Sequence, residues 1–254
     1  MSFKNERIWI IGASSGIGKS LAQYLHREGA NLILSARGED KLKALNESIG
    51  GKHIISPFDV SDYEQVERAV ADAMSHTAPL DRIICLAGIY EPAAIKDMDI
   101  AMAHKIVMVN LGGMMNMTHA VMPHLRKQGH GQLALCGSVA GFTGLPNGQP
   151  YSAAKAGVMN FTQSLRAETD PSIDIKLISP GFVETPMTDK NSFKMPMKIT
   201  PEEAAENIAK GLLNPAFELH FPKPFTLSVK FLAILPTFIK MKLLRAMYKK
   251  QQER

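Results

Sequence analysis

The sequence has very little cysteine and no arrangement that suggests a metal site. Its 254 residues include only Cys85 and Cys136, with no CxxC motif and no His/Cys pair at metal-ligand spacing. A disulfide scaffold and a zinc centre are therefore not expected, and no metal ligand is predicted. Both thiols lie within apolar runs, so we expect them to be buried in a protein of a reducing compartment.

Long hydrophobic runs and an apolar leader are also missing. The first seven residues mix charged and polar side chains, and no segment approaches the roughly 20 apolar residues that a membrane-spanning helix needs. Hydrophobic residues make up 45% of the chain and charged residues 21%, which is typical of a globular protein with a full core. A cytoplasmic location is expected.

Acidic residues are almost absent from the C-terminal end. Residues 222–254 hold eight basic groups and one acidic group, whereas residues 1–221 hold 21 basic and 23 acidic groups. The net charge of +5 therefore comes from a tail of charge +7 attached to a body of charge −2. A nucleic-acid-binding protein would carry its basic groups on a face of the folded domain, so nucleic acid is not an expected partner. The sequence predicts a domain over 1–221 and a basic, apolar tail over 222–254.

Short apolar runs alternate with segments of helical period along the domain. The runs predicted as strands are Ile8–Ile11, Leu32–Leu34, His53–Phe58, Arg82–Leu86, Gln132–Cys136, Asp174–Ile178 and Phe217–Phe221. The segments predicted as helices are Ile17–Arg27, Lys41–Ile49, Tyr63–Met74, residues 99–127, Tyr151–Glu168 and Pro201–Leu213. Strands that are apolar on both faces and alternate with helices are typical of a parallel sheet covered on both sides. The predicted fold is a single-domain, doubly wound α/β sheet.

A glycine-rich turn joins the first strand to the first helix. It reads Gly12-Ala-Ser-Ser-Gly-Ile-Gly18, which is G-x3-G-x-G rather than the common G-x-G-x-x-G. Glycines permit a tight turn and let backbone N–H groups approach a pyrophosphate, whose charge the helix N-terminus favours. The turn therefore predicts a dinucleotide site, and its candidate contacts are Gly12, Ser14, Ser15, Gly16, Ile17 and Gly18.

The end of the second strand bears on the choice of cofactor. An acidic residue there would bind the ribose 2′-hydroxyl of NAD, but this position holds Ala36. Arg37, which follows, is suited to a 2′-phosphate, so NADP is favoured over NAD. The alternative is an exposed arginine neutralised by Glu39 or Asp40.

Two residues after the third strand are further candidates for cofactor contact. Asp59 and Val60 are placed to meet the adenine ring. Asp59 is equally suited to cap the helix that follows.

A tyrosine and a lysine four residues apart open a predicted helix. Tyr151 and Lys155 therefore lie on one helix face. A free tyrosine has a pKa of about 10, and a nearby ammonium together with a positive nicotinamide ring would lower it toward neutrality. Ser138, at the end of a strand, is placed to bond the same substrate oxygen. This pattern predicts proton transfer to a carbonyl or from an alcohol.

These motifs together resemble the short-chain dehydrogenase/reductase family over residues 5–221. The residues that carry the resemblance are Gly12, Gly16, Gly18, Asn110, Ser138, Tyr151, Lys155, Pro180 and Gly181. The resemblance implies a Rossmann-like fold and a homodimer or homotetramer. It makes Tyr151 the general acid/base, Lys155 the group that holds the nicotinamide ribose, Ser138 the group that stabilises the carbonyl, and Asn110 a support for a proton relay through water.

The resemblance also implies cofactor contacts after the fourth and sixth strands. Pro180-Gly181-Phe-Val183-Glu-Thr185 is similar to the family's segment in which the equivalents of Val183 and Thr185 hold the nicotinamide carboxamide. The family's usual Asn-Asn-Ala-Gly is Cys85-Leu-Ala-Gly88 here, so backbone contacts from Ala87 and Gly88 replace asparagine side chains. Two smaller departures are Ile11 where the family usually has threonine, and Gly137 where it often has serine.

The substrate is expected at the carboxyl ends of the strands. The candidate lining is Tyr90, residues 139–147 and an insert over about 182–200 that is rich in methionine and phenylalanine. Flexible thioethers suit an adaptable hydrophobic pocket, although the insert is equally suited to packing on its own body. The 139–147 loop has no arginine, which argues against a small acidic substrate, and Lys190, Lys194 and Lys198 leave that question open. We expect a hydrophobic or lipid-like carbonyl or alcohol.

Residues 225–250 interleave apolar and basic side chains, with Pro236 between two halves. Such a segment is suited to an anionic membrane surface, to closing over the substrate pocket, or to packing on a partner subunit. The alternative function to a reductase is a non-catalytic NADP-binding sensor or scaffold at a membrane surface. A third is a relative that uses the same tyrosine for isomerisation or dehalogenation.

Overall fold

The computed structural model describes residues 3–75, 79–191, 193 and 195–252. Of the residues singled out above, Lys194 of the insert lies outside this part of the chain, as do the last two residues of the tail.

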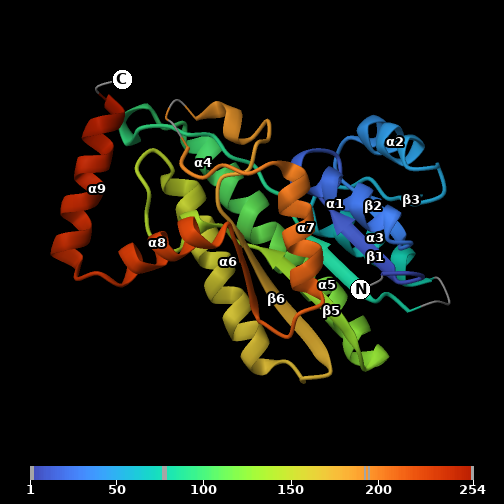
Figure 1. The fold of residues 1–254 in the computed structure, drawn as a ribbon. Helices are drawn as coiled ribbons and strands as arrows, with labels where there is room; N and C mark the ends of the chain where they lie inside the picture. Colours follow the sequence, from blue (N-terminus) through green and yellow to red (C-terminus); the bar gives the residue numbers. More distant parts are fainter. Residues whose placement is uncertain (1–2, 76–78, 192, 194, 253–254) are drawn as a thin grey trace.

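The fold is built on one sheet of seven parallel strands (Figure 1). The strands are β1 (Arg7–Ile11), β2 (Asn31–Ser35), β3 (Ile54–Ile55), β4 (Arg82–Cys85), β5 (Gly131–Cys136), β6 (Ile173–Pro180) and β7 (Glu218–Phe221). Their order across the sheet is β3-β2-β1-β4-β5-β6-β7. The chain reverses its direction of winding between β1 and β4, and in open α/β sheets ligands bind at such a switch point. The predicted doubly wound fold is confirmed.

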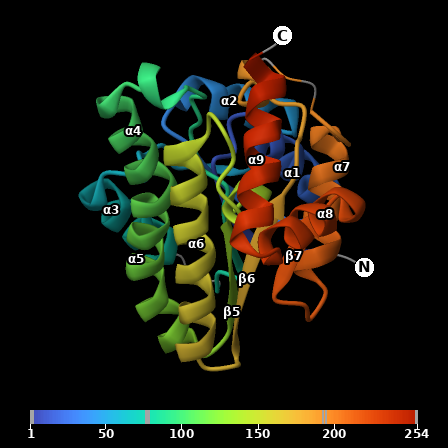
Figure 2. The same cartoon turned by 90° about the vertical axis from the view of Figure 1, so that its left-hand side faces the viewer.

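Helices cover both faces of the sheet (Figure 2). They are α1 (Gly16–Arg27), α2 (Glu39–Ser48), α3 (Tyr63–Ser75), α4 (Ile100–Val107), α5 (Gly113–Gln128), α6 (Gln149–Glu168), α7 (Pro201–Leu212), α8 (Lys223–Ile234) and α9 (Thr237–Gln252). Side chains of β1 alternate between the faces: Ile8 and Ile10 pack in the core beneath α1 and α7, and Trp9 and Ile11 in the core beneath α3 and α5. Trp9 is fully buried, and its Nε1 donates to Ser35 Oγ at 2.8 Å.

Two elements differ from the prediction. The strand expected over residues 53–58 has regular strand pairing only at Ile54 and Ile55, at the sheet edge. Beyond it, the N–H groups of Ser56 and Phe58 still donate to the carbonyls of Leu34 and Ala36, at 3.0 and 3.2 Å. The helix expected over residues 99–127 is interrupted by a π-helical turn, η2 (Met108–Gly112). Inside this turn the amide of Asn110 donates to the carbonyl of Ile106, four residues back, at 2.8 Å, and so displaces the regular backbone pattern.

The tail forms two helices that relate differently to the body. Thr226 and Val229 of α8 are buried, and α8 packs beside β7. Helix α9 stands at the margin of the molecule and is mostly exposed (Figure 1). Within the described ranges, no helix has both the length and the apolarity to cross a bilayer.

Candidate active site

The glycine turn between β1 and α1 is packed so tightly that its glycine positions leave no room for a side chain. Gly12 has φ +95°, and a Cβ there would lie 2.7 Å from the backbone nitrogen of Ala87. A Cβ on Gly18 would lie 2.1 Å from the carbonyl oxygen of Gly12. The side chain of Ser15, the N-cap of α1, makes no capping bond, so no serine oxygen competes for the first N–H groups of the helix. The turn therefore fits a pyrophosphate, as predicted.

The segment after β6 meets this turn from the other side. A Cβ on Gly16 would lie 2.9 Å from Cγ2 of Thr185, and Val183 is buried. Thr188 fixes the shape of the segment: its hydroxyl donates to the carbonyl of Val183 at 2.6 Å and accepts from the N–H of Thr185 at 3.0 Å. Thr188 was missed in the sequence, although the Thr-x-x-Thr spacing is a signal for such a turn. Pro180 ends β6, and Gly181 follows it directly.

Arg37 and Asp59 lie together beyond the carboxyl ends of β2 and β3. The guanidinium Nη1 is 3.9 Å from Asp59 Oδ2, and the Arg37 side chain is 56% exposed. The neutralisation by Glu39 considered above does not occur, because that carboxylate pairs with Lys43 at 2.8 Å. Arg37 is therefore only loosely held and is available to a ligand.

Asp59 does not cap the helix after it. Its Oδ1 accepts from the N–H and the hydroxyl of Ser61, and Asp62 instead accepts from the N–H of Gln65 at 3.1 Å. Val60 is buried against Gly113, where a Cβ would lie 2.6 Å from Val60 Cγ2. Asp59 therefore does not serve as the N-cap of α3, and the charged side chain that it pairs with is Arg37.

The four predicted catalytic residues come together at the ends of β4 and β5. Ser138 follows β5, and Tyr151 and Lys155 lie in the first turns of α6. Ser138 and Tyr151 line the same cavity, where the Ser138 hydroxyl acts on the pKa of the Tyr151 phenol, and Lys155 Nζ lies 5.6 Å from the centre of the Tyr151 ring. Lys155 Nζ also donates to the carbonyl of Cys136 at 2.7 Å.

Asn110 completes this group from the π-helical turn. It is fully buried, and its Nδ2 donates to the carbonyl oxygens of Ile89 and Ile106, both at 2.8 Å. Its Oδ1 has no hydrogen-bond partner among the described residues. A Cβ on Gly88 would lie 2.6 Å from this oxygen and 3.7 Å from Lys155 Nζ. An acceptor that is buried and unpaired beside the lysine fits a bound water or a cofactor hydroxyl.

Electrostatics at the tyrosine differ from the expectation drawn from the sequence. Burial raises the pKa of Tyr151 well above its usual value, Cys136 acts in the same direction, and the hydrogen bond from Ser138 opposes them. Burial also lowers the pKa of Lys155. The lowering expected from Lys155 is therefore absent in the protein by itself, since its ammonium is bonded to a backbone carbonyl and burial disfavours both charged forms.

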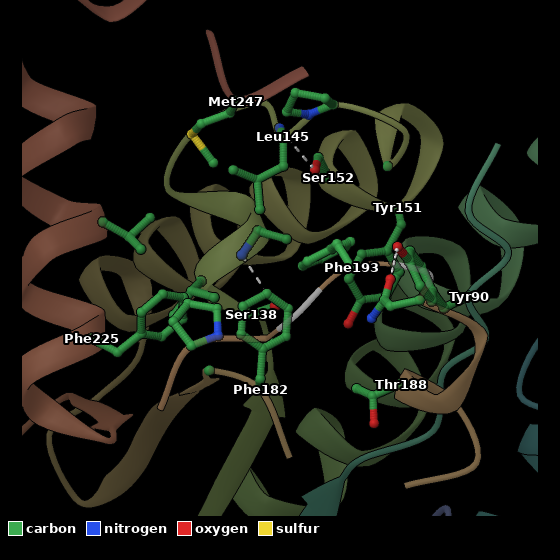
Figure 3. Close-up of a pocket in the computed structure, with 18 of the residues that line it drawn as sticks. Tyr90, Ser138, Leu145, Tyr151, Ser152, Phe182, Thr188, Phe193, Phe225 and Met247 are labelled. Atoms are coloured by element: carbon green, nitrogen blue, oxygen red, sulfur yellow. Dashed lines mark hydrogen bonds between the residues drawn. The ribbon is translucent and has the colours of Figure 1, made fainter. Parts of the chain in front are cut away.

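A cavity of about 450 Å³ adjoins Tyr151 and Ser138 (Figure 3). Among the described residues its lining includes no charged side chain. Tyr90 forms one wall: its ring meets that of Tyr151 edge-on at 5.0 Å, and its hydroxyl donates to Asn191 Oδ1 at 2.9 Å. Lys190 pairs with Glu91 and does not belong to the described lining of the cavity. Of the two described insert lysines, Lys198 also pairs outside the cavity, with Glu184 at 3.0 Å.

The C-terminal helices supply another wall. Phe225, Val229 and Leu232 of α8 and Met247 of α9 line the cavity, and the Phe225 ring lies 5.2 Å from that of Phe182 in the insert. Closure over the pocket is one of the three interpretations of residues 225–250 given above, and these four residues all lie in that segment. In the sequence, only the apolar character of these four side chains indicates a place in the cavity wall.

Comparison with known proteins agrees with this geometry. The family model described as short chain dehydrogenase matches residues 6–195. The chain belongs to the short-chain dehydrogenase family. It is 35% identical over 186 residues to the 11-beta-hydroxysteroid dehydrogenase-like 2 protein of Arabidopsis thaliana, a match that covers 71% of this chain and 60% of that protein's length.

Two solved structures of short-chain dehydrogenases share the fold. One from Burkholderia cenocepacia, in complex with NADP, is 25% identical, with a TM-score of 0.84 over 96% of this chain and 99% of the other. One from Burkholderia phymatum, in complex with NAD, is 19% identical, with a TM-score of 0.83 over 91% and 93%. Family membership places the chain among the NAD(P)-dependent oxidoreductases that act on CH–OH groups.

Proposed function

We propose that this short-chain dehydrogenase uses NADP(H) to interconvert a hydrophobic, lipid-like carbonyl and its alcohol, with Tyr151 as general acid/base. The observation that carries the proposal is the direct opening of Tyr151 and Ser138 onto a 450 Å³ cavity with no charged side chain in its described lining. An apolar substrate body fits such a wall, and its one polar oxygen would meet the two hydroxyl groups. A short carboxylate substrate finds no cationic partner there.

The reaction consists of one hydride transfer and one proton transfer, and the side chains of the site serve the proton transfer and hold the reactants. A bound nicotinamide supplies or accepts the hydride. Ser138 Oγ bonds the substrate oxygen, and Tyr151, held by Ser138, donates a proton to it in reduction and removes the proton in oxidation. Lys155 Nζ and the unpaired Oδ1 of Asn110 both lie close to Gly88, where they would hold the nicotinamide ribose and a relay water. We therefore assign the cofactor contacts of Gly12–Gly18, Ala87–Gly88 and Pro180–Thr185 to this one bound molecule.

The preference for NADP rests on Arg37, which is exposed and only loosely paired. We expect Arg37→Ala to raise the Kd for NADPH roughly 10- to 100-fold, the equivalent of losing hydrogen bonds between two charged groups, and to leave the Kd for NADH unchanged. Fluorescence titration of both cofactors measures this. Lys43→Ala, which removes a neighbouring basic group paired with Glu39, is the matched control. Equal weakening of both cofactors by Arg37→Ala would contradict the NADP assignment.

Burial of the phenol gives the two directions of the reaction different pH profiles. Because the raised pKa of Tyr151 keeps the phenol protonated near neutrality, kcat/KM for carbonyl reduction should be flat between about pH 6 and 8. Alcohol oxidation needs the phenolate, so its initial rate should rise by up to about tenfold per pH unit until the phenol of the cofactor complex has titrated. Initial rates in both directions measure this, and a reduction rate that climbs with pH would contradict it.

The test of the function is NADPH oxidation across aldehydes and ketones of graded length and ring number. The hydroxysteroid dehydrogenase-like relative makes sterol-sized ketones one arm of the panel. Activity should rise with the apolar area of the substrate. Tight NADPH binding without turnover of any member would favour the alternative, a non-catalytic sensor or scaffold. We further propose that the protein is cytoplasmic and forms a homodimer or homotetramer. The mass of the protein in solution tests the oligomeric state.

A further inference from the structure

The two C-terminal helices, α8 and α9, expose an unusual amount of apolar surface. Fifteen large apolar side chains are exposed in the described part of the chain, and nine of them belong to these two helices. Phe231, Ile234 and Phe238 are the most open, with exposed fractions of 62%, 79% and 76%. A patch of this kind, gathered on neighbouring elements, marks an interaction surface.

The same two helices are basic and contain no acidic residue. Residues 223–252 hold no aspartate or glutamate. Two of the lysines are occupied: Lys230 pairs with Glu218, and Lys240 donates to the carbonyl of Ala233. Lys242, Arg245 and Lys249 are exposed and form no ion pair within the described residues. Their spacing of three and four residues places them along one side of α9.

We propose that α8 and α9 dock on an anionic lipid surface, and that the substrate cavity opens toward that surface. The connection is Met247, which lines the cavity and is also 41% exposed, on the helix that carries the three free basic groups. Phe225 and Val229 of α8 continue the apolar wall inward to Ser138 and Tyr151. A substrate dissolved in the lipid would then reach the active site without crossing water. This delivery of substrate from the lipid rests on the proposed function, whereas the docking of α8 and α9 on the lipid surface does not.

Charge decides between a lipid surface and a second copy of the chain. A two-fold interface would place the patch against its own copy and bring the free basic groups of both together. An anionic bilayer instead neutralises them while accepting the phenylalanine and isoleucine side chains. A basic, apolar helix lying in the plane of the interface does not need the length of a spanning helix.

The experiment is sedimentation of the full-length protein with vesicles of phosphatidylcholine alone or mixed with phosphatidylserine. The protein should bind the mixed vesicles, and more weakly at high salt. Each basic group contributes roughly a fivefold factor at such a surface, so K242E/R245E/K249E should lower the partition coefficient by at least about 100-fold. The matched control is K41E/K52E/K127E, which makes the same change in net charge at exposed lysines elsewhere and should retain binding.

Several outcomes would overturn the docking proposal. The first is that the wild-type protein does not bind the mixed vesicles. The second is that both triple variants lose vesicle binding to the same extent. A third is a fall in oligomeric mass for F231D/F238D, measured by sedimentation velocity, with vesicle binding retained, since that would make the patch an interface between copies. Circular dichroism melting confirms that each variant is folded.

A second readout separates docking from catalysis. Reduction of a water-soluble ketone should be equal in the wild type and in K242E/R245E/K249E, because none of the three residues lines the cavity. Reduction of a long-chain ketone held in the mixed vesicles should fall in that variant in proportion to the lost binding. If neither ketone is reduced, the proposed function fails while the vesicle result still stands on its own. If the vesicle-held ketone is reduced equally by both proteins, lipid delivery is wrong.

Discussion

Tyr151→Phe is expected to lower kcat for carbonyl reduction by about 10²- to 10⁴-fold, the range that a positioned general acid contributes. The phenol is the group that both contacts the cavity and is held by the Ser138 hydroxyl. Phenylalanine keeps the ring, and with it the edge-on contact with Tyr90, so the shape of the pocket survives. Steady-state kinetics should show the loss in kcat, while fluorescence titration shows an unchanged Kd for NADPH.

The neighbouring tyrosine provides the control. Tyr90→Phe removes a hydroxyl whose partner is Asn191 rather than Ser138, so this variant should keep most of its kcat and change mainly KM. A Tyr151→Phe enzyme as fast as the wild type would refute the mechanism. Equal losses in both variants would show that the two hydroxyl groups act on pocket shape instead of proton transfer.

Gly18→Ala should raise the Kd for NADPH by about 10- to 100-fold. The added methyl would lie 2.1 Å from the carbonyl oxygen of Gly12, a backbone atom that cannot rotate away. The turn or the start of α1 must shift, and overpacking of this kind costs about 1–3 kcal/mol. The shift displaces the N–H groups that would face the pyrophosphate, so most of that cost should appear in cofactor affinity.

Gly38→Ala is the matched control, because nothing lies within 4 Å of a Cβ there and its φ is negative. It should leave both the Kd and the melting temperature unchanged. A Gly18→Ala protein that melts far below the wild type yet binds NADPH with the same Kd would show that this glycine serves the helix-to-strand packing and not the phosphate turn.

The sheet and the positions of Ser138, Tyr151 and Lys155 were predictable because their signals are local. Alternating apolar runs determine a parallel sheet, and the order of the strands then brings Ser138 and Tyr151 to the same edge. The Gly12–Gly18 turn needs only its position between the first strand and helix. Asn110 was predicted from family resemblance alone, and the structure adds that its Oδ1 is buried and has no hydrogen-bond partner among the described residues.

Other features depend on packing that composition does not encode. The π-helical turn arises because one side-chain amide finds the Ile106 carbonyl, which no periodicity reveals. The sequence left the tail free to lie on a membrane, over the substrate pocket or on a partner subunit. The burial of Thr226 and Val229 shows that α8 packs on the body of the protein. The raised pKa of Tyr151 in the cofactor-free protein could not be predicted, because the sequence shows its charged neighbour but not the depth of its burial or the carbonyl that holds Lys155.

The burial of Trp9 gives the protein a built-in optical reporter. It is the sole tryptophan in the chain, it is fully buried, and β1 runs from it directly into the glycine turn. Tryptophan emission overlaps the absorption band of a reduced nicotinamide, so quenching by energy transfer reports cofactor occupancy from a single site. Since Trp9 belongs to the sheet and not to the insert or the C-terminal helices, its signal separates cofactor binding from events at the substrate pocket or at a lipid surface.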